Sequence, residues 1–162
     1  MELKAESVAH QLSLLLAGRE FYDYPALQKD KELREIATQN IYAGYPEEIK
    51  AGYIAVMDNS GYAILHPNPN IEGHNLGEWK DKFPAMWEMA ERSFLEDEVS
   101  GAYNFFDEDS NETRQKYMVI YRVKGTPFSV YATVYIDKYF KPVHRAIQEA
   151  VRAESLNAET RI

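Results

Sequence analysis

The segment FSVYATVYI (128–136) constrains the fold most strongly, because its side chains divide into two apolar or aromatic sets. Successive residues of a strand point to opposite faces of a sheet. One face carries Val130, Ala132, Val134 and Ile136, and the other carries Tyr131, Thr133 and Tyr135. Because neither set suits full exposure to water, we expect a sheet that is covered on both faces by helices or loops.

Local patterns predict the order of the other elements. Apolar residues at helical spacing predict helices over residues 3–20, 25–43, 84–95 and 142–153, and the polar tail 154–162 is expected to fray. Runs of β-forming residues predict strands over 52–58, 61–67, 101–107 and 113–123, besides 128–136. The first two runs are joined by Asp-Asn-Ser-Gly, which is typical of a hairpin. The predicted class is α+β, with a five-stranded antiparallel sheet, a long N-terminal helix, a central helix and a C-terminal helix.

Composition narrows the possible functions. The chain has 162 residues and no cysteine, so disulfides, a thiol nucleophile and cysteine-ligated metals are excluded. Its net charge of −8 argues against a nucleic-acid partner, which would call for a basic face. No apolar run approaches the roughly 20 residues that span a bilayer. The 12 tyrosines combine apolar rings with polar tips, and such a surplus suits a partly hydrated pocket or an interface.

A series of motifs follows the first predicted strand. The segment GYIAVMDNSGYAILHPNPNIEGHNLGEW contains a strand ending in Asp58, a turn with Gly61, a second strand ending in His66-Pro67, and then Gly73 and Leu76. Further along, Gly101 opens a strand, KYMVIYRV includes Lys116, and an aromatic strand ends in TVYIDKYF. The order of elements resembles the PAS-like topology. The ordered motifs resemble the Cache superfamily, which comprises extracytoplasmic PAS-like sensor modules of bacterial receptors.

The resemblance implies an organisation and a setting. The chain is similar to the single-Cache type, with an N-terminal helical segment (1–50), a PAS-like core (51–140) and a C-terminal helix (141–162), all in one domain. In such a receptor, flanking transmembrane helices connect the sensor to a kinase, cyclase or chemotaxis output, so we expect this chain to be part of a longer protein. A homodimer through the N-terminal helix is the expected assembly. The Arg-x-Trp-Tyr pattern of double-Cache amino-acid sensors is absent, which disfavours an α-amino acid as the ligand.

The expected ligand pocket lies between the sheet, the 66–77 loop and the 83–95 helix. Lys116 is the main candidate, because a cation in an aromatic pocket would pair with a ligand carboxylate. An exposed lysine at a strand edge is the competing interpretation. Aromatic residues are core residues by default, and for His66 the competing role is a hydrogen bond to the loop backbone. The predicted binding set is Trp79, Met86, Tyr103, Phe105, Lys116, Met118, Tyr121, Tyr131, Tyr135 and His66.

Other chemistry finds no support in the sequence. The four histidines, of which His144 is expected on the surface, show no metal-ligand spacing. The segment DEDSNE (107–112) begins like a calcium loop but lacks the required glycine and glutamate. No nucleophile, phosphate-binding or dinucleotide motif is present, so we predict no enzyme activity, no metal and no cofactor.

Three hypotheses remain. The first is an extracytoplasmic sensor domain that binds a small organic molecule, with a short carboxylate as the favoured class. The second is a ligand-free module for dimerisation or protein interaction, whose pocket would be filled by its own side chains. The third, a cytoplasmic PAS domain holding haem or flavin, lacks a convincing axial histidine on the central helix.

Overall fold

The computed structural model describes residues 1–44 and 49–160, except for the side chains of 141–144, 146 and 157–160. Its centre is one antiparallel sheet in the order β1 (Asn40–Ala43), β2 (Ile49–Asp58), β6 (Phe128–Tyr135), β5 (Glu112–Arg122) and β4 (Glu98–Asp107). A sixth strand, β3 (Ala63–Leu65), pairs with β2. The α+β, PAS-like class predicted from the sequence is confirmed, but the described sheet has six strands and not the five predicted, because β1 was not foreseen.

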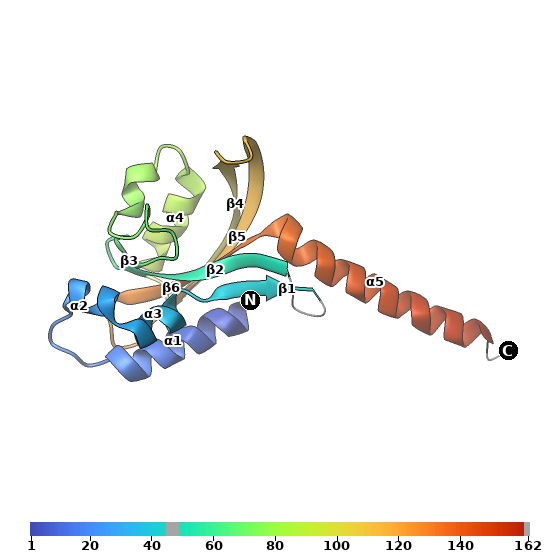
Figure 1. Ribbon diagram of the computed structural model, residues 1–162, viewed down its shortest axis with the longest axis horizontal. Helices are drawn as coiled ribbons and strands as arrows, with labels where there is room; N and C mark the ends of the chain where they lie inside the picture. Colours follow the sequence, from blue (N-terminus) through green and yellow to red (C-terminus); the bar gives the residue numbers. More distant parts are fainter. Residues whose placement is uncertain (45–48, 161–162) are drawn as a thin grey trace.

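Helices from the N-terminal part cover one face of this sheet. They are α1 (Glu2–Leu16), α2 (Tyr24–Lys29) and α3 (Lys31–Ala37), which lie together in Figure 1. The aliphatic side of β6, including Val130 and Val134, is buried in one cluster with Leu12 of α1. This is the covered aliphatic face that the alternation in 128–136 predicts.

The opposite face is covered by α4 (Pro84–Ser93) and by the segment that contains the short helix η1 (Leu76–Trp79) (Figure 1). Here Tyr131 of β6 and Met118 of β5 share a cluster with Met89 of α4. The sheet therefore lies between two layers, and the tyrosine side of β6 belongs to the face beneath α4.

The prediction of one helix over 25–43 is wrong. Asp30 has an extended backbone, and its carboxylate accepts a hydrogen bond from the Leu33 amide, so it caps α3 and separates it from α2. Beyond α3, Ile41 is buried in the edge strand β1, which pairs with β2. The apolar residues at helical spacing also suit two short helices and a strand, because such short elements are set by tertiary pairing.

The C-terminal helix also differs from the prediction. Helix α5 (Ile136–Thr160) begins directly after β6, six positions before the predicted start at Pro142, and continues through most of the tail that was expected to fray. Figure 1 shows it projecting away from the sheet. Its first turns are anchored, because the Tyr139 hydroxyl accepts from the Met1 amine at 3.2 Å and Phe140 packs edge-on against Tyr117. The prediction for the His144 side chain lies outside the described residues.

None of the described helices has both the length and the apolar character that crossing a membrane requires.

Candidate functional site

A cavity of about 620 Å³ lies on the α4 side of the sheet. Its floor consists of inward-facing side chains of β2, β6, β5 and β4, and its walls come from the 66–71 loop, η1 and the start of α4. Nine of the ten predicted residues border it: His66, Trp79, Met86, Tyr103, Phe105, Lys116, Met118, Tyr131 and Tyr135. The sequence thus places most of its candidates around one cavity.

Tyr121 is the exception, and its predicted place in the pocket is corrected. Along β5, Lys116, Met118 and Ile120 share one parity, and Tyr121 has the other. Its ring packs against the cluster beneath α1, on the opposite face of the sheet from the cavity.

Aromatic rings surround the side chain of Lys116. Its Nζ lies 3.8 Å from the centre of the Phe105 ring, 4.8 Å from that of Tyr135 and 5.7 Å from that of Tyr53. These rings come from three strands, β4, β6 and β2, so the sheet itself positions the cage. Cation–π attraction of this kind stabilises a desolvated ammonium.

The Lys116 ammonium has no hydrogen bond or ion pair with any residue that the structure describes. Every fully buried side-chain nitrogen or oxygen in the described part of the chain does have a hydrogen-bond partner, so this ammonium must meet the solvent of the cavity. Burial, opposed in part by the negative charge of Asp107, lowers the pKa of Lys116 to about 8. At neutral pH the site therefore holds a charged cation to which no described protein group is hydrogen-bonded.

Tyrosine hydroxyls add further donors beside this ammonium. Among the described residues, Tyr53, Tyr103 and Tyr135 have no hydrogen-bond partner for the hydroxyl. Burial raises the pKa of each. Proximity to Tyr135 raises the pKa of Tyr53 and of Tyr103 further, and the charge of Asp107 raises that of Tyr135. These phenols therefore stay protonated and able to donate. A group of donors around one cation is suited to an anion.

His66 borders the same end of the cavity, with its ring edge-on to Tyr53 at 5.0 Å. The Asn68 amide donates to Nδ1 at 2.9 Å, so the neutral ring carries its proton on Nε2. Burial, together with the charge of Lys116, lowers the pKa of His66 to about 4. The hydrogen bond to the loop backbone that the sequence suggested is present, and the Nε2–H remains as a donor.

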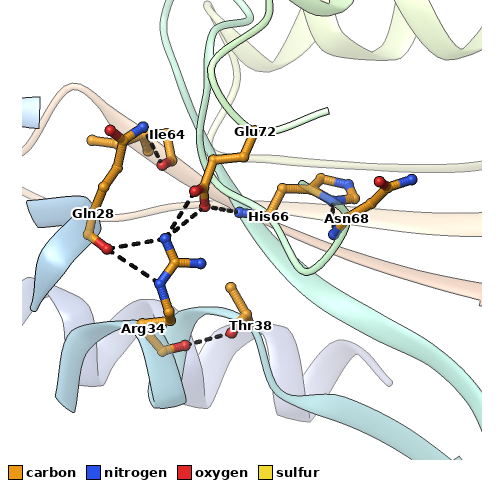
Figure 2. Close-up of polar contacts among 7 residues, drawn as sticks. All are labelled: Gln28, Arg34, Thr38, Ile64, His66, Asn68 and Glu72. Carbon is orange, nitrogen blue, oxygen red and sulfur yellow. Dashed lines mark hydrogen bonds and ion pairs between the residues drawn. The ribbon is translucent and has the colours of Figure 1, made fainter. Parts of the chain in front are cut away.

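Figure 2 shows how the loop that carries His66 is fixed. The Glu72 carboxylate accepts from the His66 backbone amide at 2.9 Å and from the Arg34 guanidinium at 2.8 Å. Arg34 also donates to the carbonyl of Gln28, whose side chain in turn donates to the carbonyl of Ile64. Residues of α2 and α3 therefore hold the loop that borders the cavity, although they lie outside the cavity themselves.

We predict that Glu72→Gln weakens both this loop and the site. The substitution removes the charge that pairs with Arg34, and for a partly exposed pair we expect a loss of about 1 kcal/mol in unfolding free energy. Because His66 belongs to the same loop, affinity for an anionic ligand should fall several-fold. Thermal unfolding and ligand titration measure both effects. Glu78→Gln removes an exposed partner of His74 and is the control; equal behaviour of the two variants would contradict the role given to Glu72.

The other part of the cavity is apolar. Register places Lys116 opposite Tyr135, Met118 opposite Thr133, and Ala55 opposite Tyr131. Beyond the level of Lys116 the lining is mostly apolar, with Ala55, Met57, Leu76, Met86 and Met118, and Thr133 and Tyr131 supply the hydroxyl groups there. At that end the Tyr131 hydroxyl is already paired with Ser93 Oγ at 3.3 Å. The cavity is therefore charged and donor-rich at one end and apolar along the rest of its length.

Charged residues of both signs form the rim. Lys82 and Glu108 are paired at 2.8 Å, and Phe83 stacks on Phe105 with ring centres 5.1 Å apart. These two contacts join the segment before α4 to the end of β4. Asp107 lies on the same rim and pairs with Arg114 at 3.8 Å.

Sequence reasoning missed Tyr53 and Thr133, which both line the cavity. Thr133 could have been predicted from the alternation along its strand, because it shares the parity of Tyr131 and Tyr135. Tyr53 required the register, in which it lies opposite Thr133 across the β2–β6 pair. In the part of the chain that the structure describes, no group of three or more acidic or histidine side chains is arranged to hold a metal ion.

Comparison with protein families gives a match over much of the chain. The profile of the Cache 3/Cache 2 fusion domain matches residues 49–149, which is more than half of the sequence. The chain belongs to this family. The match includes every strand from β2 to β6, so it contains the whole floor of the cavity. No curated protein matches the chain.

Similar solved structures also come from sensors. A methyl-accepting chemotaxis protein from Vibrio parahaemolyticus RIMD 2210633 is 16% identical, with a TM-score of 0.54. The alignment covers 85% of this chain and 84% of the chemotaxis protein's chain. A Cache chemosensory domain described for carboxylic acid recognition is 22% identical, with a TM-score of 0.45 over 53% of this chain. A periplasmic sensor domain of a chemotaxis protein is 19% identical, with a TM-score of 0.43 over 53% of this chain. The present chain spans about 60% of the length of each of the last two structures. The likeness to the chemotaxis protein from Vibrio parahaemolyticus, with its TM-score of 0.54, shows the fold alone.

Proposed function

We propose that this Cache domain is the extracytoplasmic sensing part of a membrane signal-transduction receptor and that it binds a small organic anion. The observation that carries the proposal is the unpaired Lys116 ammonium, which lies in a cavity among protonated donors. A carboxylate can accept from the ammonium and from tyrosine hydroxyls at the same time, and charge-assisted hydrogen bonds are the stronger kind. Membership of a Cache family supports the receptor setting.

The cavity also bears on the alternative of a ligand-free interaction module. Such a module would fill the space above the sheet with its own side chains. A space of about 620 Å³ is within the usual range for small-molecule sites, and it has polar groups gathered at one end. These properties favour a sensor. A homodimer through α1 and a role for α5 in carrying the signal remain proposals, and a ligand could act only through unequal affinity for two receptor conformations.

Thermal shift against matched compounds tests the proposal. The panel consists of acetate, propionate and phenylacetate, with acetamide and phenylacetamide as neutral controls and phenethylamine as a cationic one. We expect the carboxylates to raise the melting temperature, because a ligand that binds only the folded state stabilises it. The amides and the amine should leave it unchanged. A panel in which no acid acts, or in which the amine acts instead, would refute the proposed anion site.

The pKa of Lys116 predicts how affinity depends on pH. Binding of an anion requires the protonated amine, whose pKa in the free protein is about 8. Affinity should be nearly constant from about pH 5.5 to 7, where the ligand carboxylate is ionised, and should fall as pH rises through 8. Between pH 7 and pH 9 the dissociation constant should increase about tenfold. Isothermal titration with acetate at these two pH values measures the change, and a constant affinity would exclude Lys116 as the binding cation.

A further inference from the structure

The cavity follows β6 over several residues. Its lining includes Tyr135, Thr133 and Tyr131, three successive inward positions of this strand. At about 3.3 Å per residue, the backbone from the first to the last of them spans about 13 Å. A volume of about 620 Å³ holds many water molecules, each of which occupies roughly 30 Å³ in the liquid. A two-carbon acid would displace only a few of these and would leave most of the space to water.

Positive charge that is free to bind a ligand is confined to one end. Lys116 marks this end through its contacts with Phe105 and Tyr135. Lys50, near the start of β2, also borders the cavity and lies towards the same end as Tyr135. Two other cations near the cavity are already engaged, because Lys82 pairs with Glu108, and Arg114 pairs with Asp137 at 2.9 Å. The rim also carries Asp107, Glu108 and Asp109, which would repel a second carboxylate there.

Helix α4 fixes which side chains face the middle of the cavity. Phe83, just before this helix, stacks on Phe105 near the charged end, and Ser93 at its other end bonds to Tyr131 at the apolar end. Met86 lies between these two points and borders the cavity. Met118 borders the same stretch from the sheet. Flexible methionine side chains can adapt to apolar groups of different shapes.

We propose that the ligand of this cavity is a monocarboxylate with an extended apolar body, of the size of a medium-chain or arylalkanoic acid. The carboxylate pairs with Lys116, and the body lies along Met118 and Met86 towards Tyr131. The inference rests on the proposed anion site and adds the chemistry of the rest of the ligand. A dicarboxylate of equal length would have to place its second charge among mostly apolar side chains, where no cation pairs with it, which is unfavourable.

Calorimetric titration of the intact domain with acetate, hexanoate and adipate tests whether the ligand is a monocarboxylate with an extended apolar body. Each methylene that leaves water strengthens binding about fourfold, so hexanoate should bind at least about tenfold more tightly than acetate. Adipate has the same chain length and should bind at least about tenfold more weakly than hexanoate. Binding of acetate as tight as that of hexanoate would overturn the apolar-body proposal and leave the anion site standing. Adipate as the tightest ligand would also overturn it, whereas the absence of binding by all three acids would overturn both proposals.

A pair of variants localises the apolar contact. Met86 is only partly buried, so the Met86→Gln protein should fold. Its affinity for hexanoate should be several-fold lower than that of the wild type, and its affinity for acetate should be unchanged. Leu95 follows α4, is 91% exposed and does not border the cavity. Leu95→Gln is therefore the matched control, and it should change the affinity for neither acid. Equal losses for acetate and hexanoate in Met86→Gln would overturn the placement of the apolar body.

Discussion

Replacement of Lys116 by methionine should abolish most anion binding and at the same time make the protein more stable. Loss of a charge-assisted hydrogen bond costs about 1.5–3 kcal/mol, so affinity for a carboxylate should fall at least about tenfold. Stability should rise because burial holds the pKa of this lysine at about 8, below its ordinary 10.5. The unfolded chain therefore binds the proton more tightly, and at neutral pH the charge opposes folding by up to about 3 kcal/mol.

The direction of the pH effect follows from the same shift. In the wild-type protein the unfolded state binds more protons between pH 8 and pH 10.5, so the contribution of Lys116 to stability becomes less unfavourable as pH rises through this range. Lys116→Met should lose this dependence. Lys124→Met, at the exposed turn between β5 and β6, is the matched control and should change neither affinity nor melting temperature appreciably. Destabilisation by Lys116→Met with unchanged affinity would mean that the lysine serves the fold and not a ligand.

Gly52→Ala should destabilise the protein strongly, because β2 and β6 approach each other closely at this glycine. Gly52 lies in β2 opposite Val134 of β6, and a β-carbon there would overlap the carbonyl oxygen of Thr133. The obstacle is backbone, which cannot move aside as a flexible side chain can. We expect a loss of about 3 kcal/mol or more in unfolding free energy, because the two strands would have to separate locally. Thr133 borders the cavity, so ligand affinity should decrease as well.

The control for this substitution is Gly18→Ala. Gly18 has a φ of +78° and no atom within 4 Å of an added β-carbon, so only backbone strain opposes the change. That strain is worth about 1–2 kcal/mol. Chemical denaturation of both variants gives the comparison. A Gly52→Ala protein as stable as Gly18→Ala would show that β2 and β6 do not approach as closely as described.

Much of the fold could be predicted because long strands carry a strong period-2 signal. The alternation along 128–136 predicted the two covered faces, with Val130 beneath α1 and Tyr131 beneath α4. Short elements could not be predicted in this way. Residues 40–43 form an edge strand because β2 offers backbone partners, and the division between α2 and α3 depends on the cap made by one aspartate. The strand and the break between the helices depend on tertiary contacts and local capping more than on the spacing of apolar residues along the sequence.

The residues of the candidate site could be predicted where the alternation of side chains along a strand and the sequence motifs agree. The prediction was wrong where this alternation was not taken into account. Lys116 and Met118 lie on the cavity face of β5, and Tyr121 has the opposite parity. Tyr53 was missed because its place in the cage depends on the register between β2 and β6. Arg34 and Glu72 also could not be foreseen, since their pairing joins α3 to a loop distant in sequence.

The most direct test of the anion site is the pKa of Lys116 itself, measured by NMR on a protein with isotope-labelled lysine side chains. Lys116→Met assigns the signal. In the free protein the titration should have its midpoint near pH 8. With saturating acetate or phenylacetate, a carboxylate beside the ammonium should raise the pKa by one unit or more. An unchanged pKa in the presence of an acid that demonstrably binds would place the ligand elsewhere and contradict the proposed site.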